Sequence, residues 1–298
     1  MIKDESDAKP ASGAFQTGNN AIITGAASGI GLAMARRFRA MGVNVCMLDA
    51  DGERLRRVSE DLKQETGAAG LDESGAEVLA LEVDVSKVDE LEAARKAAWE
   101  RWGKPPSVLV NNAATRIGGG VFSPLEDWRF TFEVNLWGVV NGVGVFGPGM
   151  IEAGAPGLII NVGSKQGITN PPGNTAYNMT KAAVRTYTEA LEHSLRSKPD
   201  RSVSAHLLVP GWTTTGDREH KTGAWLPDQV VDYMFDALDR GSFYIVCPDD
   251  DVSEEMDHAR ILWTAGDITE DRPPLSRWVE DYKQLFENSS PGARNRGG

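Results

Sequence analysis

The chain has 298 residues, of which 41% are hydrophobic, so it is long enough to bury one sizeable core. Its formal net charge of −12 argues against binding to nucleic acid or to an anionic membrane surface. No apolar run approaches the roughly 20 residues of a membrane span, and no signal peptide is visible at the N-terminus. We therefore expect a cytoplasmic protein.

Residues 1–18 are polar and predict a disordered N-terminal arm. From residue 19 to residue 250, short apolar runs alternate with helical patterns, which predicts one α/β domain with a doubly wound parallel sheet covered by helices on both faces. Ligands bind such sheets at the carboxyl ends of the strands. Strands are expected near residues 20–25, 43–49, 77–83, 107–111, 157–162, 202–209 and 243–247.

The first predicted strand enters a glycine-rich turn, TGAASGIG at residues 24–31, and a helical pattern follows. Glycines permit the tight turn, and the free N–H groups at a helix start attract phosphate, as in a Rossmann fold that binds a dinucleotide. The alternative is a strand–helix turn without a ligand. The candidate pyrophosphate-binding residues are Gly25, Ser28, Gly29, Ile30 and Gly31.

The second predicted strand ends in Asp49. A carboxylate at this place can accept hydrogen bonds from the adenosine ribose and repels the 2′-phosphate of NADP. Ser28 offers no cation to that phosphate, so both positions favour NAD over NADP. The alternative is that Asp49 merely begins the turn at residues 49–52.

Residues 65–76 form a Gly/Ala/acid insertion, expected to be a surface excursion before the third strand. Cys46 and Cys247 lie in different predicted strands and are expected to be buried free thiols. The four histidines show no ligand spacing, so no metal site is expected.

A serine, a tyrosine and a lysine form the candidate catalytic group. Ser164 follows the fifth predicted strand, and Tyr177 and Lys181 are four residues apart on the next predicted helix, so they share one face. A cation beside a phenol lowers the pKa of the phenol. This arrangement suits proton transfer to or from a C–OH or C=O group.

These motifs, in this order, resemble those of the short-chain dehydrogenase/reductase family over about residues 18–250. Two departures are mild: Ala114 stands where the family often has Gly, and Gly163 where a second Ser is common. The motifs are TGAASGIG, Asp84 in LEVDVS, Asn111-Asn112-Ala113-Ala114, Asn135 in FEVNLWG, Ser164, Tyr177-x-x-x-Lys181 and Pro210-Gly211.

The resemblance implies catalytic roles for four residues. Tyr177 would be the general acid/base, and Lys181 would lower its pKa and bind the nicotinamide ribose. Ser164 would hold the substrate oxygen. Asn135 would anchor a water in a proton relay.

The resemblance also implies a cofactor groove. Asp84 and Val85 would flank the adenine, and Thr213 and Thr215 would contact the nicotinamide carboxamide. The further groove residues that it implies are Asn111, Ala113, Pro210 and Gly211.

The substrate pocket is less well defined by the sequence. Trp212 and Trp225, in the loop after Pro210, predict an apolar wall, and Gln166 predicts one polar contact; ordinary packing is the alternative for each indole. Arg116 either binds an acid group of the substrate or faces solvent.

Beyond the catalytic domain, residues 251–288 predict a helical extension and 289–298 a disordered tail. An apolar stripe with helical spacing in the extension predicts packing on its own domain or on a partner subunit, with an active-site lid as the alternative. The family resemblance implies a homodimer or homotetramer, with the helices near 124–153 and 174–197 at the interface. The stripe consists of Leu275, Trp278, Val279, Tyr282, Leu285 and Phe286.

The combined interpretation is an NAD-dependent enzyme that interconverts a secondary alcohol and a ketone, with a bulky apolar or aromatic substrate. One alternative is a nucleotide-sugar epimerase or dehydratase, although such relatives usually have TGxxGxxG and a longer substrate domain. The other is an NAD-binding redox sensor without turnover, although such proteins commonly lose one of the catalytic residues.

Overall fold

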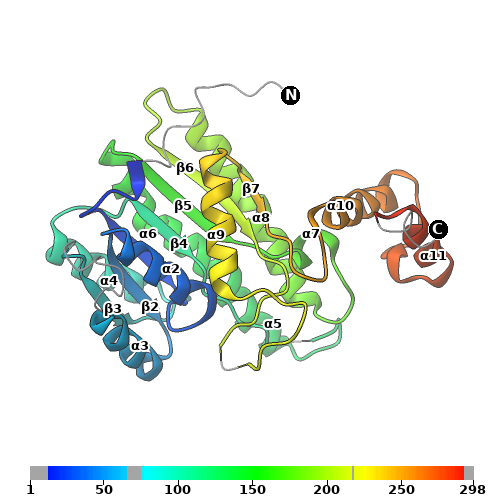
Figure 1. Ribbon diagram of the computed structural model, residues 1–298, viewed down its shortest axis with the longest axis horizontal. Coiled ribbons are helices and arrows are strands. Elements are labelled where there is room, and N and C mark those ends of the chain that lie inside the picture. The colour runs from blue at the N-terminus through cyan, green and yellow to red at the C-terminus, as the bar shows by residue number, and fades with distance from the viewer. Residues whose placement is uncertain (1–12, 66–74, 118, 217, 292–298) are drawn as a thin grey trace.

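The computed structural model describes residues 13–65, 75–117, 119–216 and 218–291. Within them, seven parallel strands form one sheet in the order β3-β2-β1-β4-β5-β6-β7 (Figure 1). Each strand lies within a residue or so of its predicted run, which confirms the predicted fold. The strands are β1 Asn20–Thr24, β2 Asn44–Asp49, β3 Val78–Glu82, β4 Val108–Asn111, β5 Gly157–Val162, β6 Val203–Val209 and β7 Tyr244–Val246.

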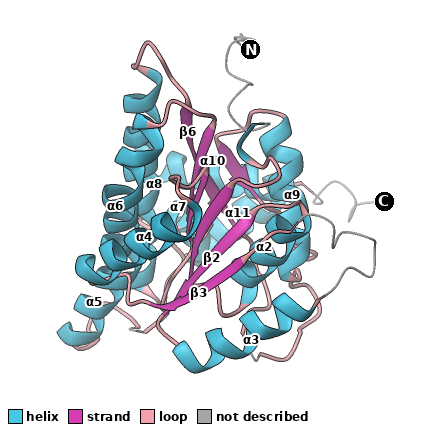
Figure 2. Cartoon of the chain, turned by 90° about the vertical axis from the view of Figure 1, so that its left-hand side faces the viewer, coloured by secondary structure: helices cyan, strands magenta, loops and turns pink. Residues whose placement is uncertain are grey.

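Helices cover both faces of the sheet (Figure 2), because successive strand side chains point to opposite faces. Met47 belongs to the core cluster on one face and its neighbour Cys46 to the cluster on the other. One face is covered by α2 (Gly29–Ala40), α3 (Gly52–Gln64) and α9 (Pro227–Asp239), and the other by α4 (Val88–Trp102), α6 (Gly138–Glu152) and α8 (Thr175–Arg196).

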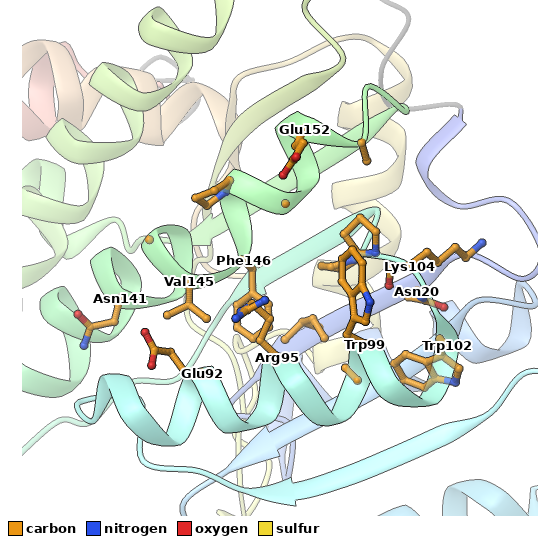
Figure 3. Close-up of a pocket in the computed structure, with 18 of the residues that line it drawn as sticks. Asn20, Glu92, Arg95, Trp99, Trp102, Lys104, Asn141, Val145, Phe146 and Glu152 are labelled. Carbon is orange, nitrogen blue, oxygen red and sulfur yellow. Dashed lines mark hydrogen bonds between the residues drawn. The ribbon is translucent and has the colours of Figure 1, made fainter.

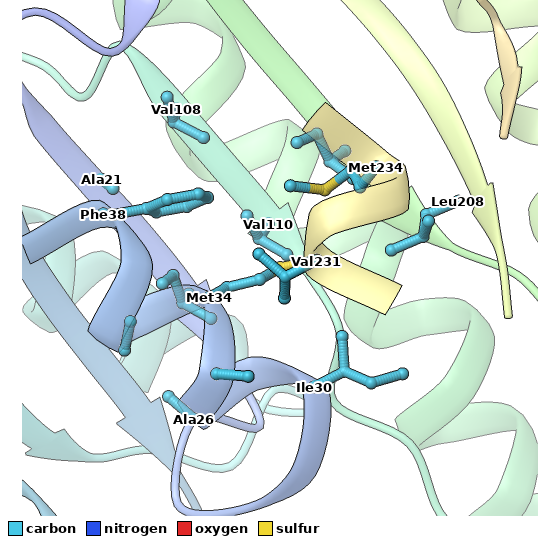
Figure 4. Close-up of a cluster of buried hydrophobic side chains, with 14 of the residues drawn as sticks. Ala21, Ala26, Ile30, Met34, Phe38, Val108, Val110, Leu208, Val231 and Met234 are labelled. Atoms are coloured by element: carbon cyan, nitrogen blue, oxygen red, sulfur yellow. The ribbon is translucent and has the colours of Figure 1, made fainter. Parts of the chain in front are cut away.

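The cluster under α2 and α9 shows how the first face is filled (Figure 4). Met34 and Phe38 from α2 meet Met234 from α9 over Val110 of β4, and all four are fully buried. Burying side chains of this size stabilises the fold by about 1.5–3 kcal/mol each. The same packing fixes the start of α2 over β1, where the glycine-rich turn lies.

A long helical run, Leu125–Glu152, is apolar enough to cross a membrane by length and composition alone. It comprises α5 (Leu125–Phe132), the π-helical turn η3 (Glu133–Trp137) and α6. Phe146 and Met150 are buried against the sheet, and a Cβ at Gly142 would collide with Asn111 Oδ1. The run is therefore a core helix in this fold, and Gly142 permits its close approach to β4.

Both termini differ from expectation. The predicted disordered arm ends earlier than residue 18, because Ala14 is fully buried. The ring of Phe15 lies 5.0 Å from each of the rings of Phe38 and Phe235. Residues 13–18 therefore pack on the domain, while residues 1–12 lie outside the described part of the chain.

At the other end, the extension contains α10 (Glu254–Thr269), the 3-10 turn η4 (Ser276–Trp278) and α11 (Glu280–Ser289), and it projects from the domain next to α7 (Gln166–Thr169) (Figure 1). The predicted stripe does not form one helix, since Leu275 has φ 57° and Val279 is extended. Phe286 alone of the stripe is buried, and it packs on Trp263 at 5.2 Å. The end of the predicted tail, residues 292–298, lies outside the described residues.

Cys46 and Cys247 are free and buried, as predicted, and burial raises the pKa of each thiol to about 12. Most of the predicted insertion, residues 66–74, lies outside the described residues.

Candidate active site

A cavity of about 540 Å³ opens at the carboxyl ends of the strands. It extends from Asp49, the last residue of β2, and Asp84, after β3, to Ser164 and Tyr177 on the β5 side of the sheet. Most of the predicted site residues line this one cavity. They are Gly25, Ser28, Gly29, Ile30, Asp49, Asp84, Val85, Ala113, Ser164, Tyr177, Lys181, Pro210, Gly211, Thr213 and Thr215.

The glycine-rich turn fits a dinucleotide phosphate. Gly25 and Gly29 have φ of 64° and 55°, values that favour glycine. Gly31 lies beneath the turn, where a Cβ would collide with the Gly25 carbonyl. The first turn of α2 has no side-chain cap and no acidic residue, so its N–H groups and positive helix end can receive an anion.

Asp49 lies beside this turn and also supports it. One carboxylate oxygen accepts a hydrogen bond from the Ala27 N–H at 2.9 Å, and the other accepts one from the Asp51 N–H at 3.0 Å. The carboxylate is half-buried and lines the cavity. The two predicted roles of Asp49 are therefore compatible: its carboxylate begins the turn at residues 49–52 and also lines the cavity.

The prediction for Asn111 is wrong, because its side chain does not line the cavity. Asn111 is the last residue of β4, and it donates to Asn161 Oδ1 at 2.8 Å in the core beneath α6. Its neighbour Asn112 turns to the cavity and donates to the carbonyls of Thr24 and Gly25 at 3.0 Å each. Strand alternation assigns the two adjacent asparagines to opposite faces, and the sequence alone gave no register.

Tyr177 is buried among groups that favour its ionised form. Burial by itself raises the pKa of the phenol, but the charges of Lys181 and Arg116 and hydrogen bonds from Ser164 and Arg116 outweigh burial, so the pKa of Tyr177 lies below its ordinary value. Lys181 Nζ lies 5.7 Å from the ring centroid and Arg116 Cζ 5.3 Å. The predicted Ser–Tyr–Lys group is therefore assembled, with Arg116 as a fourth member.

Lys181 is buried, which lowers the pKa of its ammonium, while Tyr177 opposes that shift. Its Nζ donates to the Val162 carbonyl at 2.8 Å. An ammonium has three donors, so two more can serve other groups in the cavity.

Asn135 lies in the π-helical turn η3 and is fully buried, outside the cavity lining. Its Oδ1 accepts from the Thr115 N–H at 2.7 Å, and its Nδ2 donates to the Thr115 carbonyl and to Thr180 Oγ1. The side-chain amide thus holds the loop that carries Arg116.

The predicted substrate wall is wrong, since Gln166, Trp212 and Trp225 do not line the cavity. Trp225 packs on Tyr233 at 5.9 Å and donates to Asp250, because a β-bridge to Thr213 turns it toward α9. Trp212 is 45% exposed. Gln166 is the first residue of α7, and its N–H donates to Ser164 Oγ.

Sequence reasoning missed several lining residues near Tyr177. Phe130 and Val134 come from α5 and η3, and Thr115 precedes Arg116 in the loop after β4. Their helical pattern gave no sign that they face a cavity.

A buried ion cluster joins the C-terminal extension to this site. Lys165, the residue after Ser164, contacts Asp257 of α10 at 2.5 Å and Asp249 at 3.3 Å, and all three side chains are at most 15% exposed. Asp249 also accepts from the Trp212 N–H at 2.9 Å. Burial raises the pKa of Asp257, and the hydrogen bond from Lys165 opposes the shift.

We expect Lys165→Met to lower the free energy of unfolding by about 3 kcal/mol, because it leaves two buried carboxylates without their cation. Asp257→Asn should cost less, since Asp249 still pairs with Lys165. Urea denaturation of both variants measures the difference. An Asp257→Asn variant that is the less stable of the two would contradict this account of the cluster.

A larger cavity, of about 900 Å³, lies between α4 and α6 (Figure 3). Arg95 and Trp99 of α4 and Val145 of α6 line it. None of the predicted catalytic or cofactor-binding residues reaches this cavity, so it is not the candidate active site.

Comparisons with known proteins agree with this geometry. The family model described as short chain dehydrogenase matches residues 19–224. The 1-deoxy-11-beta-hydroxypentalenate dehydrogenase of Streptomyces arenae is 30% identical over 274 residues, which cover 87% of this chain and 92% of that protein.

Solved structures show the same similarity. A short-chain dehydrogenase/reductase from Burkholderia phymatum in complex with NAD matches with a TM-score of 0.76 and 29% identity, over 88% of this chain and 97% of that one. A metagenomic short-chain oxidoreductase in complex with NADP matches with a TM-score of 0.63 and 27% identity, over 78% of this chain and 98% of that one. The chain therefore belongs to the short-chain dehydrogenase/reductase family of oxidoreductases.

Proposed function

We propose that this protein interconverts a secondary alcohol and a ketone with NAD as its cofactor. The observation that carries the proposal is the buried Tyr177, which lines the same cavity as Ser164. The cations Lys181 and Arg116 lie 5.7 and 5.3 Å from the centroid of its ring. A phenol with a lowered pKa, within reach of a bound carbinol oxygen, can act as general acid/base near neutral pH.

NAD, held by the glycine-rich turn and the other cavity residues, would supply the hydride chemistry. Ser164 donates a hydrogen bond to the substrate oxygen and stabilises the charge that develops there. Tyr177 takes the proton from the alcohol during oxidation and gives it to the ketone oxygen during reduction. Lys181 keeps the phenolate accessible and has donors left for a ribose hydroxyl. Thr213 and Thr215, which line the cavity, would hold a carboxamide.

The pH dependence follows from the direction of the Tyr177 shift. Alcohol oxidation needs the phenolate, so its rate rises with pH through the pKa of Tyr177; ketone reduction needs the phenol, so its rate falls through the same pKa. Because the pKa of Tyr177 is lowered, the rates of oxidation and of reduction should both change at a pH below 10, which is about the ordinary pKa of tyrosine.

The preference for NAD is supported by Asp49, the acidic residue nearest the glycine-rich turn in the cavity lining. The proposed apolar body of the substrate is supported by Phe130 and Val134 rather than by the two indoles. A relative whose name describes a hydroxypentalenate dehydrogenase supports oxidation at an alcohol carbon.

The test is a spectrophotometric screen at 340 nm with NAD and NADP against aliphatic, aromatic, steroidal and sugar alcohols and their ketones. NAD-linked turnover of secondary alcohols is the expected result. Silence across the panel, with NADH binding still detected by fluorescence, would instead favour the alternative of a non-catalytic NAD-binding sensor.

A further inference from the structure

Arg116 lies directly beside the proposed reacting atoms. Its guanidinium lies over the Tyr177 ring, with Cζ 5.3 Å from the centroid, and its charge contributes to the lowered pKa of the phenol. Asn135 holds the preceding residue, Thr115, through two hydrogen bonds to its backbone. The loop that carries the arginine is therefore tied to the buried helix η3 instead of being free to swing away.

Nothing in the described part of the chain neutralises this cation. No carboxylate among the described residues forms an ion pair with Arg116, although the protein as a whole carries twelve more negative than positive charges. The acidic residues of the cavity lining, Asp49 and Asp84, lie at the opposite end, at the end of β2 and after β3. The substrate end of the cavity therefore carries positive charge from Arg116 and Lys181.

Arg116 is also exposed and lines the cavity, so most of its five N–H donors are available. A guanidinium presents two parallel donors that match the two oxygens of a carboxylate. Since the guanidinium lies over the Tyr177 ring and the substrate oxygen would bind at the Tyr177 hydroxyl, a second substrate group held by Arg116 would lie close to the carbinol.

We propose that Arg116 binds a carboxylate of the substrate, placed on the carbon next to the carbinol or one bond farther away. The substrates of this enzyme are then hydroxy acids and the matching keto acids, with an apolar body against Phe130 and Val134. This proposal rests on the proposed alcohol/ketone chemistry and names the substrate class of that same site.

A different role would leave the substrate class open. If Arg116 served only to lower the pKa of Tyr177, its removal would slow all substrates alike and move the limb of each pH–rate profile to higher pH. A carboxylate-binding role instead makes the loss depend on the substrate. The two roles are therefore separated by comparing an acid with its ester.

The experiment uses the full-length protein with NADH and two matched pairs: benzoylformate with methyl benzoylformate, and acetoacetate with methyl acetoacetate. Wild type is compared with Arg116→Gln, Arg116→Lys and Arg129→Gln, the last removing an exposed charge from α5 outside the cavity lining. We expect Arg116→Gln to lower kcat/KM for a keto acid by about 10- to 100-fold relative to its ester, as for a lost charge-assisted hydrogen bond. Arg116→Lys should lose part of the wild-type preference for the keto acid over its ester, and Arg129→Gln should lose none of it.

Binding provides a second measurement that does not require turnover. Quenching of NADH fluorescence reports binding of benzoate and benzamide to the enzyme–NADH complex, and we expect benzoate to bind more tightly in wild type but not in Arg116→Gln. If Arg116→Gln lowers kcat/KM equally for acid and ester, or if neither assay shows a preference for a carboxylate, the proposed carboxylate site is wrong. Reduction of the esters would still uphold the alcohol/ketone chemistry. Arg116-dependent benzoate binding without turnover of any ketone would uphold the carboxylate site and overturn the proposed reaction.

Discussion

Replacing Tyr177 by Phe is expected to reduce kcat by about 10²- to 10⁴-fold, the range for loss of a positioned general acid/base. The variant keeps the ring, and with it the packing of a side chain that is only 5% exposed. It removes the hydroxyl whose pKa is lowered by the charges of Lys181 and Arg116. Steady-state rates at 340 nm in both directions measure the effect.

The control for Tyr177→Phe is cofactor binding. Fluorescence titration with NADH should give a Kd close to that of the wild type, because the glycine-rich turn and Asp49 are unchanged. Ser164→Ala is a useful comparison, since it removes a hydrogen bond from the substrate oxygen but leaves the proton carrier. Near-normal turnover by Tyr177→Phe would exclude Tyr177 as the proton carrier.

Replacing Asp49 by Ala is expected to lower the NAD/NADP ratio of kcat/KM by about 100-fold or more. The Asp49 carboxylate would face the 2′-phosphate of NADP, and two like charges in contact cost several kcal/mol. Kinetics with both cofactors against one alcohol measure the ratio.

Asp49→Asn separates the charge from the support of the turn. The amide keeps an oxygen that can accept from the Ala27 N–H but carries no negative charge. If repulsion of the phosphate is the cause, Asp49→Asn should relax the preference as Asp49→Ala does, with a smaller loss of stability. An unchanged ratio in both variants would show that discrimination between the cofactors lies elsewhere.

The sequence predicted the sheet well, and also that the glycine-rich turn and Asp49 would meet at the carboxyl ends of its strands, for physical reasons. Buried parallel strands appear as short apolar runs, and the glycines of the first turn report backbone conformations that few other residues adopt. Positive φ at Gly25 and Gly29 matches that expectation. Tyr177 and Lys181 were predictable as neighbours because helical periodicity is local.

The errors concern contacts between segments distant in the sequence. Asn111 and Asn112 are adjacent and chemically identical, and only the end of β4 decides which one turns to the cavity. Trp225 was assigned to the cavity from its loop, but a bridge to Thr213 turns it toward α9. The position of Arg116 beside Tyr177 depends on Asn135, which the sequence places nineteen residues downstream.

Because the chain is synthesised from its N-terminus, the contact between Lys165 and Asp257 forms late. Every described residue that lines the 540 Å³ cavity has been synthesised by residue 218, but Asp257 follows much later. A product truncated after residue 253 would retain all of that lining and leave Lys165 paired with Asp249 alone. A chain that ends there would therefore keep every described lining residue of the cavity but lose the contact by which α10 holds the segment after Ser164.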